Sequence, residues 1–264
     1  MKPQVFFRFA KEDRGLAGPR RPVPLALARA IATLLPEQRH RVALLHQEEA
    51  AAACAAVEYL HPEELLRYQG FSLPKRRREF LAGRLCAKLA LTELLPEQAL
   101  APRQLFIASD PSGRPLPPGD EAGLPPGLHL SITHGGEFAG AIAANRPCGI
   151  DLQPLGDNLL RVRERYCLPA DEVLLSQTLT HLGERERLAL LWTAKEAAKK
   201  ALSHRRMYGF LELSLVTLRP LPDSCFLLGL AVAESGAQPQ GAEALAVATL
   251  VNDCALALSV APEE

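Results

Sequence analysis

The sequence predicts an α+β fold made of two pseudo-symmetric halves, residues 1–145 and 146–264, with the active site in the cleft between them. The predicted elements follow the order helices, hairpin and strand, helices, strands. Sliding the chain by 112 residues also lays one strong helix on another, with Phe80 over Trp192. Two similar halves that meet at a pseudo-twofold axis would form a cleft, where binding sites commonly lie.

The composition is typical of a globular protein without a general affinity for nucleic acid. The chain has 264 residues, 48% of them hydrophobic, and its 30 basic side chains balance 30 acidic ones. This argues against disorder and against a nucleic-acid partner. The six cysteines are scattered, which is typical of free thiols in a reducing compartment. No apolar run reaches the roughly 18 residues that a membrane span needs. We therefore expect a cytoplasmic protein with no membrane partner.

The first sixty residues predict secondary structure but little chemistry. Residues 4–9 are expected to form a short strand, and residues 10–24 a loop rich in Arg, Gly and Pro. The Ala- and Leu-rich segments 25–35 and 37–60 predict helices. The function of residues 1–60 stays open.

Two further helices are predicted between residues 61 and 91. The first begins at His61-Pro62, because proline is favoured in the first helical turn. The second opens with Lys75 and the three arginines Arg76–Arg78. Four cations oppose the helix dipole there, which is unfavourable unless an anion or a partner compensates. The basic run is either a solvated face or a contact with an anion or a partner, and the sequence does not separate these.

The middle of the chain predicts a hairpin and a strand. Residues 110–115 form a turn, and a Pro- and Gly-rich loop follows. Residues 128–144 alternate with period two on either side of Gly135-Gly136, which indicates a hairpin. In the strand at 148–153, Asp151 and Gln153 share one face.

The last helical region, residues 158–202, is broken near Pro169 and Gly183. Near its end, Trp192, Glu196 and Lys200 recur at spacings of four and line the side opposite an apolar arc. This side is either a cleft wall or a Glu196–Lys200 salt bridge beside a core tryptophan, and the helix alone favours neither. Four strands are expected after it, at 210–218, 225–233, 244–251 and 254–260.

The polar side chains of these segments suggest a phosphate site. The carboxylates of Asp151 and Glu196, with the amide of Gln153, are oxygen ligands of the kind that Mg²⁺ prefers, and phosphate commonly supplies its remaining ligands. The expected phosphate-binding cations are Lys200, Arg114, His134 and Arg76–Arg78. From the residues alone, we infer a Mg²⁺-dependent phosphate site.

Five motifs, taken together, resemble those of the 4′-phosphopantetheinyl transferase superfamily. The main pair is Gly149-Ile-Asp-Leu-Gln153 followed by Trp192-x-x-Lys-Glu-Ala-x-x-Lys200. Three others fall in family order, namely Arg77-x-x-Phe-Leu-Ala-Gly-Arg84, Ser112-Gly-Arg-Pro115 and Ser131-Ile-Thr-His134. The similarity covers roughly residues 60–260, and the length resembles the large single-chain Sfp type. The resemblance implies a monomer.

The resemblance implies transfer of 4′-phosphopantetheine from coenzyme A to a serine of an apo acyl or peptidyl carrier protein, with release of 3′,5′-ADP. It assigns catalytic functions to Glu196, Lys200 and Asp151. Asp151 and Glu196 would bind Mg²⁺, and Glu196 or a metal-bound water would take the serine proton. Lys200 would hold the pyrophosphate or assist proton transfer, and Lys195 would support the site from behind. The residues expected to bind coenzyme A are Arg77, Arg84, Arg114, Thr133, His134, Lys195 and Lys200.

Gln153 departs from the family pattern, because many members have glutamate at this position. An amide can ligate a metal through its carbonyl oxygen or hold a metal-bound water, but the lost charge should weaken Mg²⁺ binding. Two alternatives to an enzyme follow. One is a non-catalytic relative that binds coenzyme A or a carrier protein. The other is a helical adaptor built on residues 25–70, in which Asp151 and Glu196 would be freely replaceable.

Overall fold

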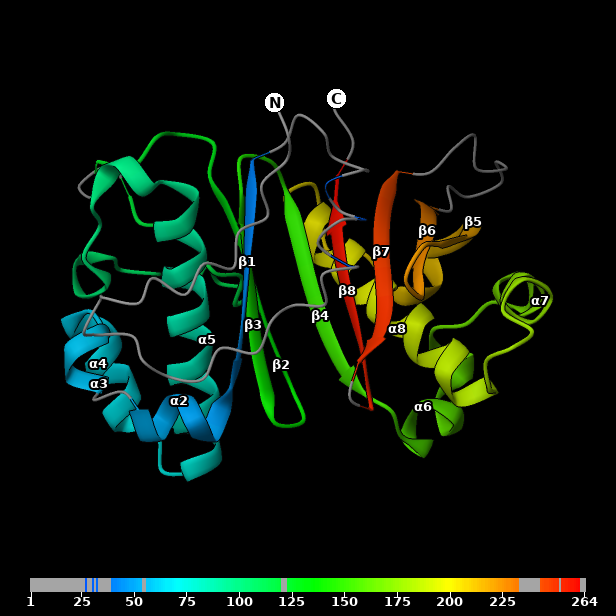
Figure 1. Ribbon diagram of the computed structural model, residues 1–264, viewed down its shortest axis with the longest axis horizontal. Helices are drawn as coiled ribbons and strands as arrows, with labels where there is room; N and C mark the ends of the chain where they lie inside the picture. Colours follow the sequence, from blue (N-terminus) through cyan, green and yellow to red (C-terminus); the bar gives the residue numbers. More distant parts are fainter. Residues whose placement is uncertain are drawn as a thin grey trace. The chain divides into compact units, whose positions relative to one another are not determined.

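The computed structural model describes residues 39–53, 56–119, 123–232, 243–251 and 253–261, together with Leu27, Ala30 and Ala32. The predicted strand at 4–9, the loop at 10–24 and most of the helix at 25–35 lie outside these residues. The described chain forms two compact units that divide between Arg146 and Pro147, and the three isolated residues belong to the second unit. Each unit combines helices with an antiparallel sheet, so the predicted α+β class is confirmed (Figure 1). The predicted cleft between the halves stays a prediction, since each unit is described by itself.

The first unit is built on a three-stranded antiparallel sheet in the order β1-β3-β2. The strands are β1 (His40–His46), β2 (His129–Gly135) and β3 (Phe138–Ala144). The predicted hairpin is thereby confirmed, and Gly136 in its turn has a φ of 56°, which glycine adopts at no steric cost. Every residue of β3 is buried.

The long helix α5 (Pro74–Leu94) packs along this sheet (Figure 1). Its residues from Leu81 to Leu91 are all buried, and they form the core of the unit with alternate residues of β1 and β3. The shorter helices of the unit are α2 (Gln47–Ala53), α3 (Ala56–Tyr59), α4 (Pro62–Gly70) and the 3-10 turns η1 (Pro96–Gln98) and η2 (Pro102–Gln104).

The prediction of one helix over residues 37–60 is wrong at its start, where the structure has β1. Val42 to Leu45 are buried, and β1 pairs with β3 over its whole length. Ala and Leu are good helix formers, but intrinsic helix propensity is a small free-energy term, and pairing with a buried strand overrides it. The helical prediction holds for α2 and α3.

The second unit contains a five-stranded antiparallel sheet in the order β4-β8-β7-β6-β5. The strands are β4 (Cys148–Pro154), β5 (Leu213–Leu221), β6 (Cys225–Val232), β7 (Ala244–Val251) and β8 (Cys254–Val260). The helices are α6 (Asp157–Arg161), α7 (Pro169–Thr178), α8 (Glu184–Leu202) and the 3-10 turns η4 (Arg163–Arg165) and η5 (Phe210–Glu212). The predicted breaks near Pro169 and Gly183 are confirmed as the starts of α7 and α8.

Helix α8 packs on β4, β8 and β7 (Figure 1). It begins after Gly183, whose N–H donates to the Glu186 carboxylate at 2.7 Å, as in a capping box. Its apolar arc is almost entirely alanine and leucine, and these residues are buried against the sheet. Small alanine side chains allow the helix to lie close to the strands.

Each unit has a buried lysine on its long helix, Lys88 on α5 and Lys195 on α8. Lys88 Nζ donates to the carbonyl oxygen of Tyr59, 29 residues earlier, and to the carboxylate of Glu64, 24 residues earlier. Lys195 Nζ makes the same two contacts with Tyr166 and Asp171, at the same separations of 29 and 24. The counterparts are therefore shifted by 107 residues. The shift of 112 predicted from helix patterns is wrong by more than one helical turn.

Candidate active site

Strand β4 and helix α8 meet backbone to backbone at Gly149. A Cβ at this position would lie 1.9 Å from the carbonyl oxygen of Ala197 and 2.9 Å from the nitrogen of Ala201. Since alternate residues of a strand share a face, Asp151 follows Gly149 on the side that faces α8. The glycine of the Gly-Ile-Asp motif thus allows the strand to bring a carboxylate against the helix.

Asp151 pairs with Lys200 of α8. The Lys200 ammonium donates to Asp151 Oδ1 at 2.7 Å and to the carbonyl oxygen of Ile150 at 2.8 Å. The Asp151 side chain is 12% exposed and that of Lys200 is 30% exposed. The pair is therefore accessible to a small ligand without being freely solvated.

Glu196 lies one turn before Lys200 on α8, and its carboxylate pairs with a different lysine. Glu196 Oε1 lies 3.3 Å from Lys199 Nζ, which also sits 3.8 Å from the centre of the Phe210 ring. Trp192 stacks on Phe210 at 4.4 Å and meets Tyr166 edge-on at 4.9 Å. Of the two alternatives for this helix face, the tryptophan fits the core position, whereas Lys200 pairs with Asp151 and Glu196 pairs with Lys199.

Gln153 shares the face of Asp151 two residues further along β4. Its side chain is partly exposed, and its amide nitrogen donates to the carbonyl oxygen of Pro154 at 3.2 Å. Among the described residues, no group of three or more His, Cys, Asp and Glu side chains is close enough to hold a metal ion. The predicted binding of a metal by Asp151, Gln153 and Glu196 stays a prediction.

Lys195 is placed differently from the prediction that it binds coenzyme A. Its side chain is fully buried, and its ammonium contacts Asp171 at 2.6 Å and the carbonyl oxygens of Tyr166 and Phe210. Burial lowers the pKa of Lys195, and the Asp171 carboxylate opposes that shift. The geometry does not support direct contact with coenzyme A, and it favours the supporting function.

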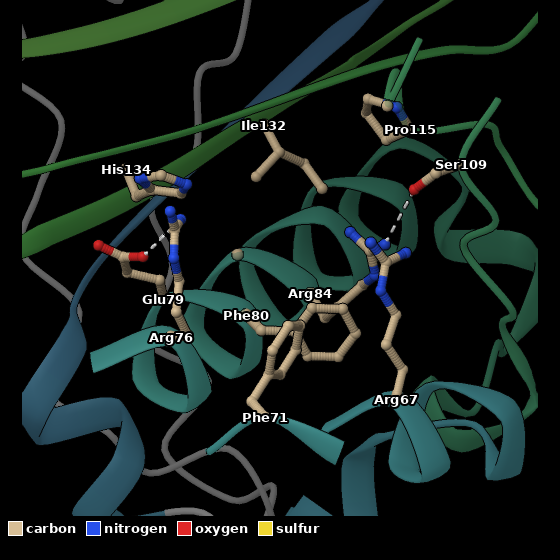
Figure 2. Close-up of a pocket in the computed structure, with 12 residues that line it drawn as sticks. Arg67, Phe71, Arg76, Glu79, Phe80, Arg84, Ser109, Pro115, Ile132 and His134 are labelled. Carbon is tan, nitrogen blue, oxygen red and sulfur yellow. Dashed lines mark hydrogen bonds and ion pairs between the residues drawn. The ribbon is translucent and has the colours of Figure 1, made fainter. Parts of the chain in front are cut away.

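The first unit contains a pocket of about 330 Å³ beside α5 (Figure 2). Cationic and aromatic side chains dominate its wall. The lining residues are Arg67, Phe71, Arg76, Glu79, Phe80, Gly83, Arg84, Ser109, Gly113, Pro115, Ile132 and His134. A wall with three arginines, a histidine and one carboxylate suits an anion.

Two of these arginines come together in the pocket. Figure 2 shows the side chains of Arg67 and Arg84 ending beside Ser109. Arg84 lies 4.8 Å from the centre of the Phe80 ring and Arg67 lies 5.7 Å from it. Burial lowers the pKa of Arg84, and the like charge of Arg67 lowers it further, while Glu64 opposes the shift. Two adjacent guanidinium groups are stabilised by an anion placed between them.

Arg84 keeps hydrogen-bonding capacity for a ligand. The residue is only 8% exposed. Its Nε lies 3.4 Å from Glu64 Oε1 but makes no aligned hydrogen bond, and its Nη2 is 3.5 Å from the Ser109 hydroxyl. Since a guanidinium has five N–H donors and Nε faces Glu64, the two Nη groups keep donors for an anion that enters the pocket.

Of the coenzyme A contacts predicted in the first half, Arg84 and His134 line the pocket and the other three do not. Arg77 donates from Nε to the carbonyl oxygen of Phe71 at 2.7 Å, where α4 ends. Arg114 pairs with Asp110 at 3.0 Å, although its neighbours Gly113 and Pro115 line the pocket. Thr133 is buried, and strand alternation places it on the face opposite His134.

The sequence reasoning missed Arg67, Phe71 and Ser109. Arg67 and Phe71 lie at the end of α4, and Ser109 precedes the turn at 110–115. No spacing pattern connects them to the other lining residues. Phe80 belongs to the recognised Arg-rich helix motif, and its position between two arginines was the available signal.

The structure adds two general observations. Cys86, Cys148, Cys167, Cys225 and Cys254 carry reduced thiols, as predicted, and burial raises the pKa of Cys148 to about 12 and that of Cys167 to about 11. Within the described part of the chain, no helix has the length and apolar character to cross a membrane.

Comparison with known proteins places both units in one enzyme family. A family model described as the 4′-phosphopantetheinyl transferase N-terminal domain matches residues 67–144, and one described as the 4′-phosphopantetheinyl transferase superfamily matches residues 147–248. The chain therefore belongs to the 4′-phosphopantetheinyl transferase superfamily, and the enzyme class predicted from its motifs is confirmed.

Two relatives each match about two thirds of the chain. The 4′-phosphopantetheinyl transferase Npt of Nocardia iowensis is 32% identical over 177 residues, which cover 65% of this chain and 68% of that protein. The 4′-phosphopantetheinyl transferase HetI of a Nostoc species is 31% identical over 174 residues, or 64% and 70% of the two chains. A solved structure of Helicobacter pylori holo-[acyl-carrier-protein] synthase in complex with coenzyme A is 18% identical, covers 39% of this chain and 96% of that one, and has a TM-score of 0.33.

Proposed function

We propose that the chain transfers 4′-phosphopantetheine from coenzyme A to the serine hydroxyl of an apo acyl or peptidyl carrier protein, with Mg²⁺. The observation that carries this proposal is the backbone contact of β4 with α8 at Gly149. Asp151 thereby lies 2.7 Å from Lys200, and Lys200 lies one turn of α8 after Glu196. Family membership supports coenzyme A and the carrier protein as the two substrates.

The donor set fits Mg²⁺. This ion is usually held by one or two protein carboxylates, keeps several waters and takes further ligands from substrate phosphates. Asp151 and Glu196 would supply the carboxylates, and Gln153 would contribute through its amide oxygen or through a water. When bound, Mg²⁺ would neutralise charge on the pyrophosphate of coenzyme A.

The side chains of the second unit would each have a separate function in the reaction. Lys200 is a point charge with three donors, two of them now on Asp151 and the Ile150 carbonyl, and it would bind a pyrophosphate oxygen. Glu196 would accept the proton of the serine hydroxyl. The serine oxygen forms a bond to the phosphorus next to pantetheine, the bond from that phosphorus to the bridging oxygen breaks, and 3′,5′-ADP leaves. Positioning and charge neutralisation supply most of the acceleration in such transfers.

The pocket of the first unit would bind phosphate and base of the adenosine end of coenzyme A. Arg67, Arg84 and His134 offer donors to phosphate, and the rings of Phe71 and Phe80, 5.4 Å apart, offer apolar area to the base. A volume of about 330 Å³ lies within the range of ligand pockets. The cytoplasmic location and the monomeric state stay predictions from the sequence.

The direct test is incubation with coenzyme A, Mg²⁺ and a panel of apo carrier proteins, followed by measurement of intact carrier mass. We expect at least one carrier to gain phosphopantetheine. Glu196→Gln and Asp151→Ala should each lower the rate by about 100-fold or more, with circular dichroism unchanged. A non-catalytic relative would bind coenzyme A in calorimetry and transfer nothing. Full turnover in either variant would refute the metal assignment.

A further inference from the structure

Glu64 is a buried acid that joins three segments of the first unit. It is 2% exposed. Its Oε2 accepts from the backbone N–H of His61 at 3.0 Å and from Lys88 Nζ, and its Oε1 accepts from the N–H of Ile107 at 3.1 Å. The same Oε1 lies 3.4 Å from Arg84 Nε. These four contacts all come from N–H donors, so this carboxylate joins the start of α4, the segment at Ile107 and the middle of α5.

Asp171 is the counterpart in the second unit. It is fully buried, and its Oδ2 accepts from the N–H of Leu168 at 3.0 Å and from Lys195 Nζ at 2.6 Å. Its Oδ1 accepts from the N–H of Leu215 at 2.8 Å. The carboxylate thus joins the start of α7, strand β5 and helix α8.

Stability alone does not account for two such buried pairs. Replacing a buried ion pair by apolar side chains of similar volume is often neutral or stabilising. Burial is also the main cause that lowers the pKa of both Lys88 and Lys195. Unlike apolar packing, hydrogen bonds between charged groups have a preferred direction. An ammonium held between a carboxylate and a carbonyl fixes both the rotation and the axial position of its helix.

Each lysine lies next to groups that the proposed function uses. Lys88 comes one helical turn after Arg84, and Glu64 contacts both side chains. Lys195 directly precedes Glu196 on α8, and Lys200 follows in the next turn. The first pair therefore aims a pocket cation, and the second pair aims the carboxylate and ammonium at the Asp151 site.

We propose that Glu64–Lys88 and Asp171–Lys195 are duplicated positioning pairs with separate targets. The first sets Arg84 for anion binding in the pocket, and the second sets Glu196 for metal binding. The inference rests on the proposed function, because that function assigns the two targets. None of these four side chains touches substrate; each acts through a neighbour.

The two pairs serve as controls for each other. Lys88→Met and Lys195→Met remove ammonium groups that are both buried and that share two equivalent contacts, one in each unit; Lys195 also contacts the carbonyl oxygen of Phe210. Coenzyme A affinity is measured by calorimetry without metal, and Mn²⁺ affinity by electron paramagnetic resonance without coenzyme A. We expect Lys88→Met to weaken coenzyme A binding by about tenfold and leave Mn²⁺ affinity within about twofold of wild type. Lys195→Met should do the reverse.

A purely structural function predicts another outcome. Both variants would then lower the melting temperature, but the folded protein would keep both affinities within about twofold of wild type, and this result would overturn the inference. A variant that fails to fold is replaced by the neutral pair, Glu64→Gln with Lys88→Met or Asp171→Asn with Lys195→Met, which leaves no uncompensated buried charge. The same selective losses are expected from these pairs.

Measurements on the wild-type protein distinguish a failure of the positioning function from a failure of the proposed function. If it binds coenzyme A and Mn²⁺ and transfers phosphopantetheine, while the variants show no selective loss, the positioning function is wrong and the proposed function stands. If it binds neither coenzyme A nor Mn²⁺, the targets do not exist and both fail.

Discussion

A methyl group on Gly149 would lie 1.9 Å from the carbonyl oxygen of Ala197, so the strand that carries Asp151 touches the helix that carries Glu196. The atoms nearest to such a methyl group are all backbone atoms of Ala197 and Ala201, which cannot rotate away as a side chain would. The glycine of this motif therefore sets the distance on which the proposed metal site depends.

We predict that Gly149→Ala lowers the free energy of unfolding by about 2 kcal/mol or more, since forced overpacking in a core costs that amount. The measurement is urea denaturation followed by circular dichroism. Gly156→Ala is the control, because a Cβ there meets nothing within 4 Å. It should change the free energy of unfolding by less than about 1 kcal/mol. Equal effects of the two substitutions would contradict the close approach.

The arginines of α5 allow a second prediction about coenzyme A. Arg84→Met should weaken binding by about tenfold or more, since a hydrogen bond to a charged group contributes roughly 1.5–3 kcal/mol. Arg77→Met should have little effect, because the Arg77 guanidinium caps carbonyl oxygens at the end of α4. Calorimetry with coenzyme A and with dephospho-coenzyme A measures both variants. A larger loss in Arg77→Met than in Arg84→Met would move the anion site out of the pocket.

Gln153 permits a gain of function. Gln153→Glu should tighten Mn²⁺ binding by about tenfold, because it adds a carboxylate to the face that carries Asp151. The control is Gln177→Glu, which adds the same charge at an exposed position of α7. Titration of Mn²⁺ followed by electron paramagnetic resonance gives both dissociation constants. If Gln153→Glu matches its control, this side chain is not near the ion.

The stability of the turn at residues 110–115, beside the pocket, should depend on pH. The Ser112 hydroxyl donates to Asp110 at 2.6 Å and is the main cause that holds the pKa of Asp110 below its usual value, with backbone N–H groups and Arg114 adding to it. A depressed pKa in the folded state means that the charged carboxylate stabilises the turn above the pKa of the unfolded chain. That contribution is lost as the pH falls through the folded-state pKa.

Ser112→Ala should therefore raise the pKa of Asp110 and move the loss of turn stability to higher pH. The measurement is a carboxyl-carbon NMR titration of Asp110. Ser176→Ala is the matched control, since the Ser176 hydroxyl donates to a backbone carbonyl and to no carboxylate. An unchanged pKa in Ser112→Ala would show that the hydroxyl does not hold the charge.

The sequence predicted the second unit better than the first, for a physical reason. Strand β4 and helix α8 carry their chemistry in contiguous motifs, and local periodicity assigns each side chain to a face. Strand β1, which lies in the Ala- and Leu-rich segment 37–60, gave no such signal. Its strand conformation comes from pairing with β3, about 100 residues away in sequence, and only tertiary structure specifies that pairing.

Charged residues were harder to assign than strands. The helix pattern does not show that the Lys195 ammonium is buried, because its burial depends on Asp171, which comes from another helix. Arg67 was missed for the same reason, since it enters the pocket from α4 while Arg84 enters it from α5. Glu64 could be read from sequence as part of a helix start, but not as the partner of Lys88.

The shift of 107 residues between the buried lysines also shows how the two units have specialised. At this spacing the position of Arg84 corresponds to Leu191, and that of Glu196 corresponds to Leu89, and both leucines are buried in the core. The first unit therefore has a guanidinium where the second has a leucine. The second unit has a carboxylate where the first has a leucine. The buried pair is thus common to both units, whereas the residues next to it differ, and the proposed function assigns anion binding to the first unit and cation binding to the second.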